Sequence, residues 1–143
     1  MLDNFRMSNY GKRLTRLVST LVQPSEKSWH HYLDLTWNGQ AGASVTFDWA
    51  NNSSKDLVIA KIIIDWPPAN DSLFNVFNGG NIIWNGEDTS PPTTITSFIG
   101  TVAARTWAAN TNDDIAFFFG LGQPTGYDLT VIFNNGWSAH VSH

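Results

Sequence analysis

Hydrophobic residues recur at every second position in three short stretches of the chain, and each stretch ends in tryptophan. The hydrophobic positions are Leu33, Leu35 and Trp37, then Val45, Phe47 and Trp49, then Ile62, Ile64 and Trp66. Side chains point to opposite faces along a β-strand, so each triplet lies on one face of a sheet. The intervening residues of the first two stretches are polar, which is typical of antiparallel sheets with one face in water.

The same pattern continues to the end of the chain, with a turn signal every 8–12 residues or so. Strands are predicted near residues 31–37, 43–49, 56–66, 73–77, 81–84, 93–99, 103–107, 114–119 and 128–134. Asn-Gly follows both Trp37 and Trp84, and Pro-Pro ends the strand at Trp66. The runs 62–64 and 117–119 do not alternate, so we expect central strands or strands covered on both faces. The sequence therefore predicts an all-β fold, an antiparallel β-sandwich of the immunoglobulin-like or jelly-roll-like kind.

The first residues follow a different period. Leu14, Leu17, Val18, Leu21 and Val22 recur at helical spacing, whereas Lys12, Arg13, Arg16, Ser19 and Thr20 occupy the other side. Pro24 would end such a helix. We expect two parts: a short amphipathic N-terminal arm over residues 1–27 and a β-sandwich domain over residues 28–143. Residues 17–21 also alternate tolerably as a strand, so the arm could instead be a strand donated to a neighbour's sheet.

Charge divides the chain in the same place. Residues 1–27 carry five basic and two acidic residues, a net charge of +3, whereas residues 28–143 carry a net charge of −7. The arm could pack as a helix on its own sheet, or dock on the acidic body of a neighbouring copy. A membrane-surface or nucleic-acid contact is disfavoured, because the bases form no run and an acidic body follows them.

Composition favours an extracellular or surface-exposed location. Only 14% of the 143 residues are charged, and the chain has no cysteine, so neither disulfides nor thiol chemistry are expected. No apolar run approaches the length of a membrane span. No signal peptide is visible, because Lys12, Arg13 and Arg16 interrupt the early apolar residues. Export would use a leader absent from this chain or a different route.

Catalytic and metal-binding motifs are not found. Two of the four histidines are His30 and His31, and the other two, His140 and His143, stand three residues apart in an apparent C-terminal tail. Asp34, Asp48 and Asp65 flank the strand tryptophans, but their even spacing indicates an outward row rather than a facing carboxylate pair. We therefore expect no enzyme activity, no metal site and no cofactor.

Tryptophan also has a possible binding role. Exposed indole rings can stack on sugars, and Trp29, Trp107 and Trp137 fall outside the buried strand pattern. These three are the candidate ligand-stacking residues, which makes a carbohydrate-binding module the main alternative function.

Several segments within residues 45–138 together resemble a known class of domain. They are residues 57–66 (LVIAKIIIDW), 83–86 (IWNG), 91–95 (PPTTI), 105–106 (RT) and 126–136 (GYDLTVIFNNG). This pattern resembles small β-sandwich domains of bacterial surface and pilus-associated proteins. In those domains the closing strand often ends Asn-Gly-Cys, whereas Trp137 holds that place here. The resemblance implies a non-catalytic, exported, structural role without a cofactor.

The sequence thus favours a structural subunit that self-assembles into an extracellular filament or a surface assembly. The predicted contact with other copies consists of apolar Leu14, Leu17, Val18, Leu21 and Val22 with basic Arg13 and Arg16. The expected partners are other copies of the chain and, in the alternative, glycans. Neither nucleic acid nor a membrane span is expected, and a membrane-surface-binding sandwich is the second alternative.

Overall fold

The structure is a computed structural model that describes residues 28–143. The sequence predictions for residues 1–27, including the arm and its helical or strand form, fall outside the described residues.

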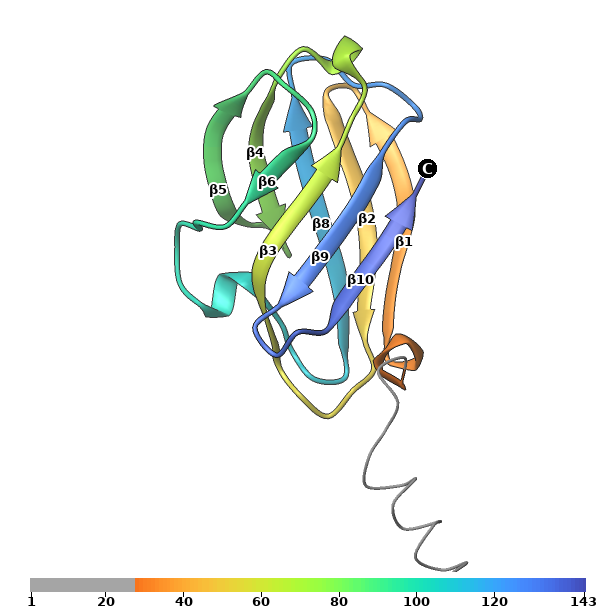
Figure 1. The fold of residues 1–143 in the computed structure, drawn as a ribbon, viewed down its shortest axis with the longest axis vertical. Helices are drawn as coiled ribbons and strands as arrows, with labels where there is room; N and C mark the ends of the chain where they lie inside the picture. The colour runs from red at the N-terminus through yellow and green to blue at the C-terminus, as the bar shows by residue number, and fades with distance from the viewer. Residues whose placement is uncertain (1–27) are drawn as a thin grey trace, which may run out of the picture.

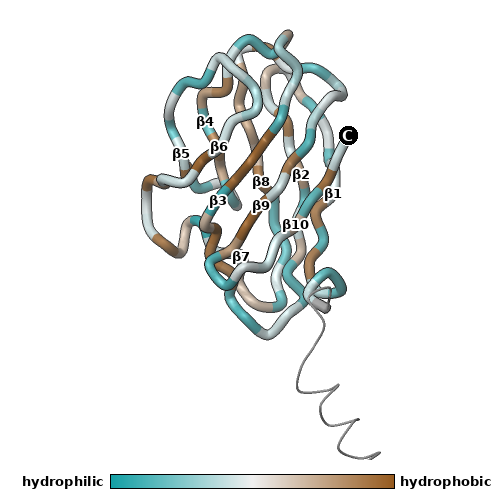
Figure 2. The backbone as a smooth tube through the Cα atoms, viewed as in Figure 1, coloured by the Kyte–Doolittle hydropathy of each residue, from teal (hydrophilic) through white to brown (hydrophobic). Residues whose placement is uncertain are grey.

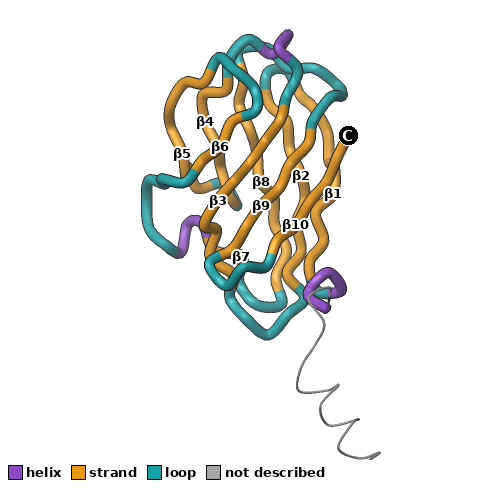
Figure 3. The backbone as a smooth tube through the Cα atoms, in the orientation of Figure 1, coloured by secondary structure: helices purple, strands orange, loops and turns teal. Residues whose placement is uncertain are grey.

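Within residues 28–143, ten strands form two antiparallel sheets that pack face to face (Figures 1 and 3). The first sheet has the order β1 (Leu33–Ala41), β2 (Ser44–Asn51), β8 (Thr111–Phe119), β4 (Leu73–Asn78) and β5 (Asn81–Asp88). The second has the order β10 (Ser138–Ser142), β9 (Asp128–Phe133), β3 (Leu57–Asp65) and β6 (Thr93–Ile95), with β7 (Thr106–Trp107) paired to β3. The helical segments are η1 (Ser28–His31), η2 (Pro68–Asn70) and η3 (Ala103–Arg105). The all-β antiparallel sandwich is confirmed.

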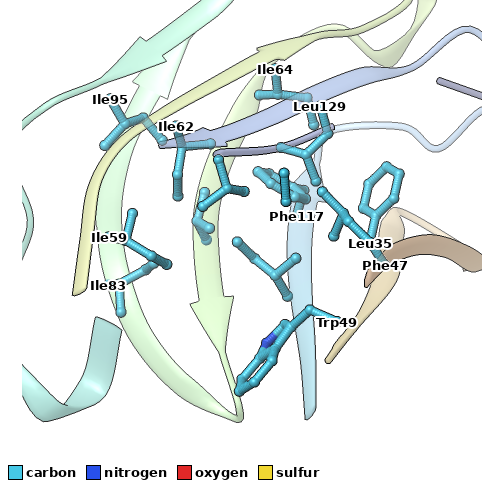
Figure 4. Packing of buried hydrophobic residues seen from close by; sticks show 14 of the residues in the cluster. Leu35, Phe47, Trp49, Ile59, Ile62, Ile64, Ile83, Ile95, Phe117 and Leu129 are labelled. Carbon is cyan, nitrogen blue, oxygen red and sulfur yellow. The ribbon is translucent and has the colours of Figure 1, made fainter. Parts of the chain in front are cut away.

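The core lies between the sheets, where the alternating residues of both meet. Figure 4 shows Leu35, Phe47 and Phe117 of the first sheet in one cluster with Ile62 and Leu129 of the second. Hydrophobic residues concentrate along β3, which pairs with β9 on one side and with β6 and β7 on the other (Figure 2). The alternation along β1 and β2 is confirmed, because their hydrophobic positions are buried, apart from the half-buried Trp37, while Asp34, Thr36 and Asp48 are exposed.

Three strand predictions need correction. The C-terminal residues are not a tail: β10 pairs with β9, and Ala139 is buried opposite Val131. β10 was missed because only one of its five side chains is buried, which leaves almost no hydrophobic pattern. The predicted strands at 93–99 and 103–107 shrink to β6 and β7. The loop between them instead follows the edge of β5, where the Ile99 amide donates to the Ile83 carbonyl at 2.9 Å.

A buried asparagine ties the two sheets together at one end of the sandwich. Asn78 Oδ1 accepts hydrogen bonds from Trp49 Nε1 at 3.0 Å and from Trp107 Nε1 at 3.1 Å, and its Nδ2 donates to the Ala104 carbonyl at 3.0 Å. The two indole rings stack with centroids 4.7 Å apart. These hydrogen bonds connect β2 and β4 of the first sheet to β7 and η3. They therefore stabilise, from the core side, two of the strands that form the outer face of that sheet.

Candidate functional site

The outer face of the first sheet gathers carboxylates from strands that are distant in the sequence. Strand register places Thr36 of β1 opposite Asp48 of β2, and Asp48 opposite Asp114 of β8. Residues paired in this way project from the same face. Asp34 and Asp113 complete the set, and together these residues line a shallow depression of about 440 Å³. We call this depression, lined by Asp34, Thr36, Asp48, Asp113 and Asp114, the acidic groove.

The carboxylates of the acidic groove repel one another. The pKa of Asp114 is raised above its ordinary value by burial, and then by the negative charges of Asp113 and Asp48. Asn38 Nδ2 donates to Asp48 Oδ1 at 2.8 Å, which supplies a hydrogen bond but no positive charge. Within residues 28–143 no lysine or arginine lies within ion-pair distance of these groups, and no cluster able to hold a metal ion is present there. The groove is therefore a concentration of negative charge without a counter-charge from the described residues.

An aromatic surface adjoins the acidic groove on the same face. Phe118 of β8 is 38% exposed, and its ring meets that of Phe77 of β4 at a centroid distance of 5.2 Å. Phe77 pairs in register with Ala116 of β8 on one side and with Ile82 of β5 on the other. We call Phe77, Ile82, Ala116 and Phe118 the aromatic patch. Asp114, Ala116 and Phe118 alternate along β8 with the buried Ile115 and Phe117, so groove and patch form one continuous surface.

This patch explains part of the run at residues 117–119. The run predicts a strand that is central or covered on both faces, and β8 is indeed the central strand of the first sheet. Its core face is covered, since Phe117 and Phe119 are buried, but Phe118 points away from the core and stays partly exposed. The sequence signal for this patch is the apolar residue Phe118 at an outward position of the strand.

The three candidate stacking tryptophans do not form a common sugar site. Trp107 is completely buried, so its prediction as an exposed platform is wrong: the short strand β7 turns it into the core beneath Trp49. Trp29 and Trp137 are half-buried and stack on each other at a centroid distance of 6.4 Å. Tyr32 also stacks on Trp137, and Lys55 Nζ lies 5.5 Å from the Trp137 ring centroid. These contacts occupy much of the Trp137 ring.

The C-terminal histidines are placed by β10. His140 Nε2 lies 3.0 Å from both carboxylate oxygens of Asp128, and Ser142 Oγ donates to Asp128 Oδ2 at 2.7 Å. These hydrogen bonds, that of Ser142 first, lower the pKa of Asp128. A hydrolase triad needs serine hydrogen-bonded to histidine, whereas here both bind the aspartate. His143 stacks on Trp37 with centroids 4.1 Å apart. The contacts of His140 and Ser142 with Asp128 therefore join β10 to β9 and do not form such a triad.

The remaining predicted site residues, Arg13, Leu14, Arg16, Leu17, Val18, Leu21 and Val22, lie outside the described residues. Among residues 28–143, none of the helical segments is long and apolar enough to cross a bilayer.

Comparisons with known proteins find similarity among solved structures. No protein-family model matches the chain, and no curated protein matches it. Among solved structures, the archaellum periplasmic stator protein FlaG from Sulfolobus acidocaldarius is similar with a TM-score of 0.38 and 12% sequence identity. The alignment covers 76% of this chain and 97% of that protein.

Proposed function

We propose that this chain is a non-catalytic structural subunit that self-assembles into an extracellular filament or surface assembly, and that its residues 1–27 contact a neighbouring copy. The observation that carries this proposal is the outer face of the first sheet, where partly exposed aromatic side chains adjoin carboxylates. The arm offers the complementary chemistry, because the helical period of residues 12–22 puts apolar side chains on one side and basic side chains on the other. Partly exposed apolar side chains that lie together on one face favour an interaction surface there.

Charge supplies the steering for such a contact. The arm carries a net charge of +3 and the sandwich a net charge of −7, and all but three of the chain's basic residues precede residue 28. Complementary charge raises association rates and suppresses wrong pairings, and the effect weakens as salt screens it. The raised pKa of Asp114 supports the same conclusion, since an approaching cation would relieve the repulsion within the acidic groove.

Burial of apolar side chains would supply most of the free energy that holds the arm on a neighbouring copy. Five apolar side chains of the arm, fully buried, would each contribute about 1.5–3 kcal/mol. The sum is comparable to or larger than the roughly 4–15 kcal/mol that association costs in lost freedom of motion. Only a contact that buries most of the five would therefore persist, which favours a defined surface over a loose electrostatic encounter.

Light scattering followed by electron microscopy of the full chain tests the proposal. Filaments, shells or defined oligomers are expected, and a monomer at high concentration would overturn the proposal and make a glycan array the next experiment. The double variant Arg13→Glu with Arg16→Glu is expected to assemble more slowly than the wild type at low salt. The matched control Lys55→Glu with Lys61→Glu makes the same change of charge outside the arm, and it should leave the rate much closer to that of the wild type.

A further inference from the structure

The proposed self-assembly leaves open where the arm binds and in which direction. Resting on that proposed function, we propose that residues 12–22 of one copy dock along β8 on the outer face of a second copy. The basic end, with Arg13 and Arg16, lies over the acidic groove, and the apolar end at Val22 lies over the aromatic patch.

The direction follows from matching polarity along both partners. On β8 the surface changes from charged at Asp114 to apolar at Phe118, four residues later, which is about 14 Å along a strand. In the arm, all charges of residues 12–22 lie at or before Arg16, and the segment from there to Val22 is uncharged. As the helix that its periodicity predicts, the arm separates Arg13 from Val22 by nine residues, also about 14 Å. The change from charged to apolar residues therefore extends over the same length on β8 and on the arm, and the two can be matched in only one direction.

The same direction requires a second copy. Val22 of an arm docked in this way lies near Phe118, toward the far end of β8, whereas its own sandwich begins at Ser28. Register places Leu33, at the start of β1, level with Thr111, so Phe118 lies seven residues, about 24 Å, further along the sheet. Figure 1 shows η1 at this near end of the sandwich, beside the start of β1. Six residue steps from Val22 to Ser28 span at most about 21 Å. In this direction the arm is therefore too short to place Val22 beside Phe118 of its own chain.

Cysteine cross-linking tests the proposal cleanly, because the chain has no cysteine of its own. One copy carries Gly11→Cys or Gln23→Cys, one at each end of the arm segment. The other carries Thr36→Cys at the acidic groove or Asn75→Cys, which is the register partner of Phe118 beside the aromatic patch. None of the four changes removes a charged or apolar residue of the proposed contact. The four mixtures of full-length singly substituted chains are oxidised under conditions in which the wild type assembles.

The pairs Gln23→Cys with Asn75→Cys and Gly11→Cys with Thr36→Cys are expected to form mixed dimers several-fold faster than the two crossed pairs. Reversed preference, or equal rates in all four mixtures while scattering still shows assembly, would overturn the docking surface and leave the proposed function intact. A wild type that stays monomeric would overturn both. The chain carrying both Gln23→Cys and Asn75→Cys is expected to yield linked oligomers, and a linked monomer would show that the arm binds its own body.

Discussion

Asn78 offers the sharpest test of how the sandwich holds its outer surface, and the change to examine is Asn78→Ala. The asparagine is 3% exposed and makes three hydrogen bonds, to two indole N–H groups and one carbonyl. After the change, Trp49 Nε1 keeps a second acceptor, the Asp114 carbonyl at 3.1 Å. Trp107 Nε1 keeps none among the described residues, and its side chain is completely buried. The change therefore leaves one buried donor, Trp107 Nε1, without a hydrogen-bond acceptor among the described residues.

The expected loss follows from these contacts. A buried donor left without a partner costs about 1–3 kcal/mol. The small cavity left by the amide adds about 1 kcal/mol. The carbonyl of Ala104 belongs to the partly exposed η3 and can bind water instead, so it adds little. Asn78→Ala should therefore lower the free energy of unfolding by about 2–4 kcal/mol, the sum of the first two effects.

Urea unfolding followed by tryptophan fluorescence measures this loss, at a protein concentration below the onset of assembly so that association does not contribute. Asn75→Ala is the matched control, because Asn75 lies on the same strand but faces outward. In the Trp107→Phe background the donor is gone, so Asn78→Ala should cost at least about 1 kcal/mol less than in the wild type. If Asn78→Ala and Asn75→Ala cost the same, or if the two backgrounds agree, the network does not stabilise the fold in the way described.

Two further predictions concern stability and pH. A Cβ at Gly122 would overlap the Gly42 carbonyl oxygen in the turn between β1 and β2. Gly122→Ala should therefore reduce the free energy of unfolding by about 1–3 kcal/mol and lower the melting temperature. An unchanged melting temperature in calorimetry would contradict that packing. Asp114 has a raised folded-state pKa, so folding favours its protonated form and the ionised form is penalised as pH rises above the ordinary value of 3.8. Asp114→Asn should therefore unfold at higher urea than the wild type at pH 7 but not at pH 3. Equal midpoints at pH 7 would contradict a pKa raised by burial and by the charges of Asp113 and Asp48.

The parts of the outer surface differ in how far the sequence predicts them. Asp34 and Asp48 are predicted as an outward row, since each alternates with buried neighbours, and both are exposed on the first sheet. That they lie close to Asp114 follows only from the pairing of β2 with β8, which are separated by about sixty residues of chain. The prediction that Trp107 is exposed was wrong for a related reason. The two residues of β7 show no alternation, so only the pairing with β3 determines which way the ring points.

By itself the sequence determined the all-β class, the buried faces of β1, β2 and β3, and most of the turns, because strand periodicity and turn chemistry are local properties of the chain. It also determined the unequal division of charge between the arm and the body. The tertiary structure decided the strand order, the existence of β10, the burial of Trp107 under Asn78, and the meeting of acidic groove and aromatic patch along β8. Each of these depends on which distant strands pair, and pairing is set by how the whole set of side chains fills one core.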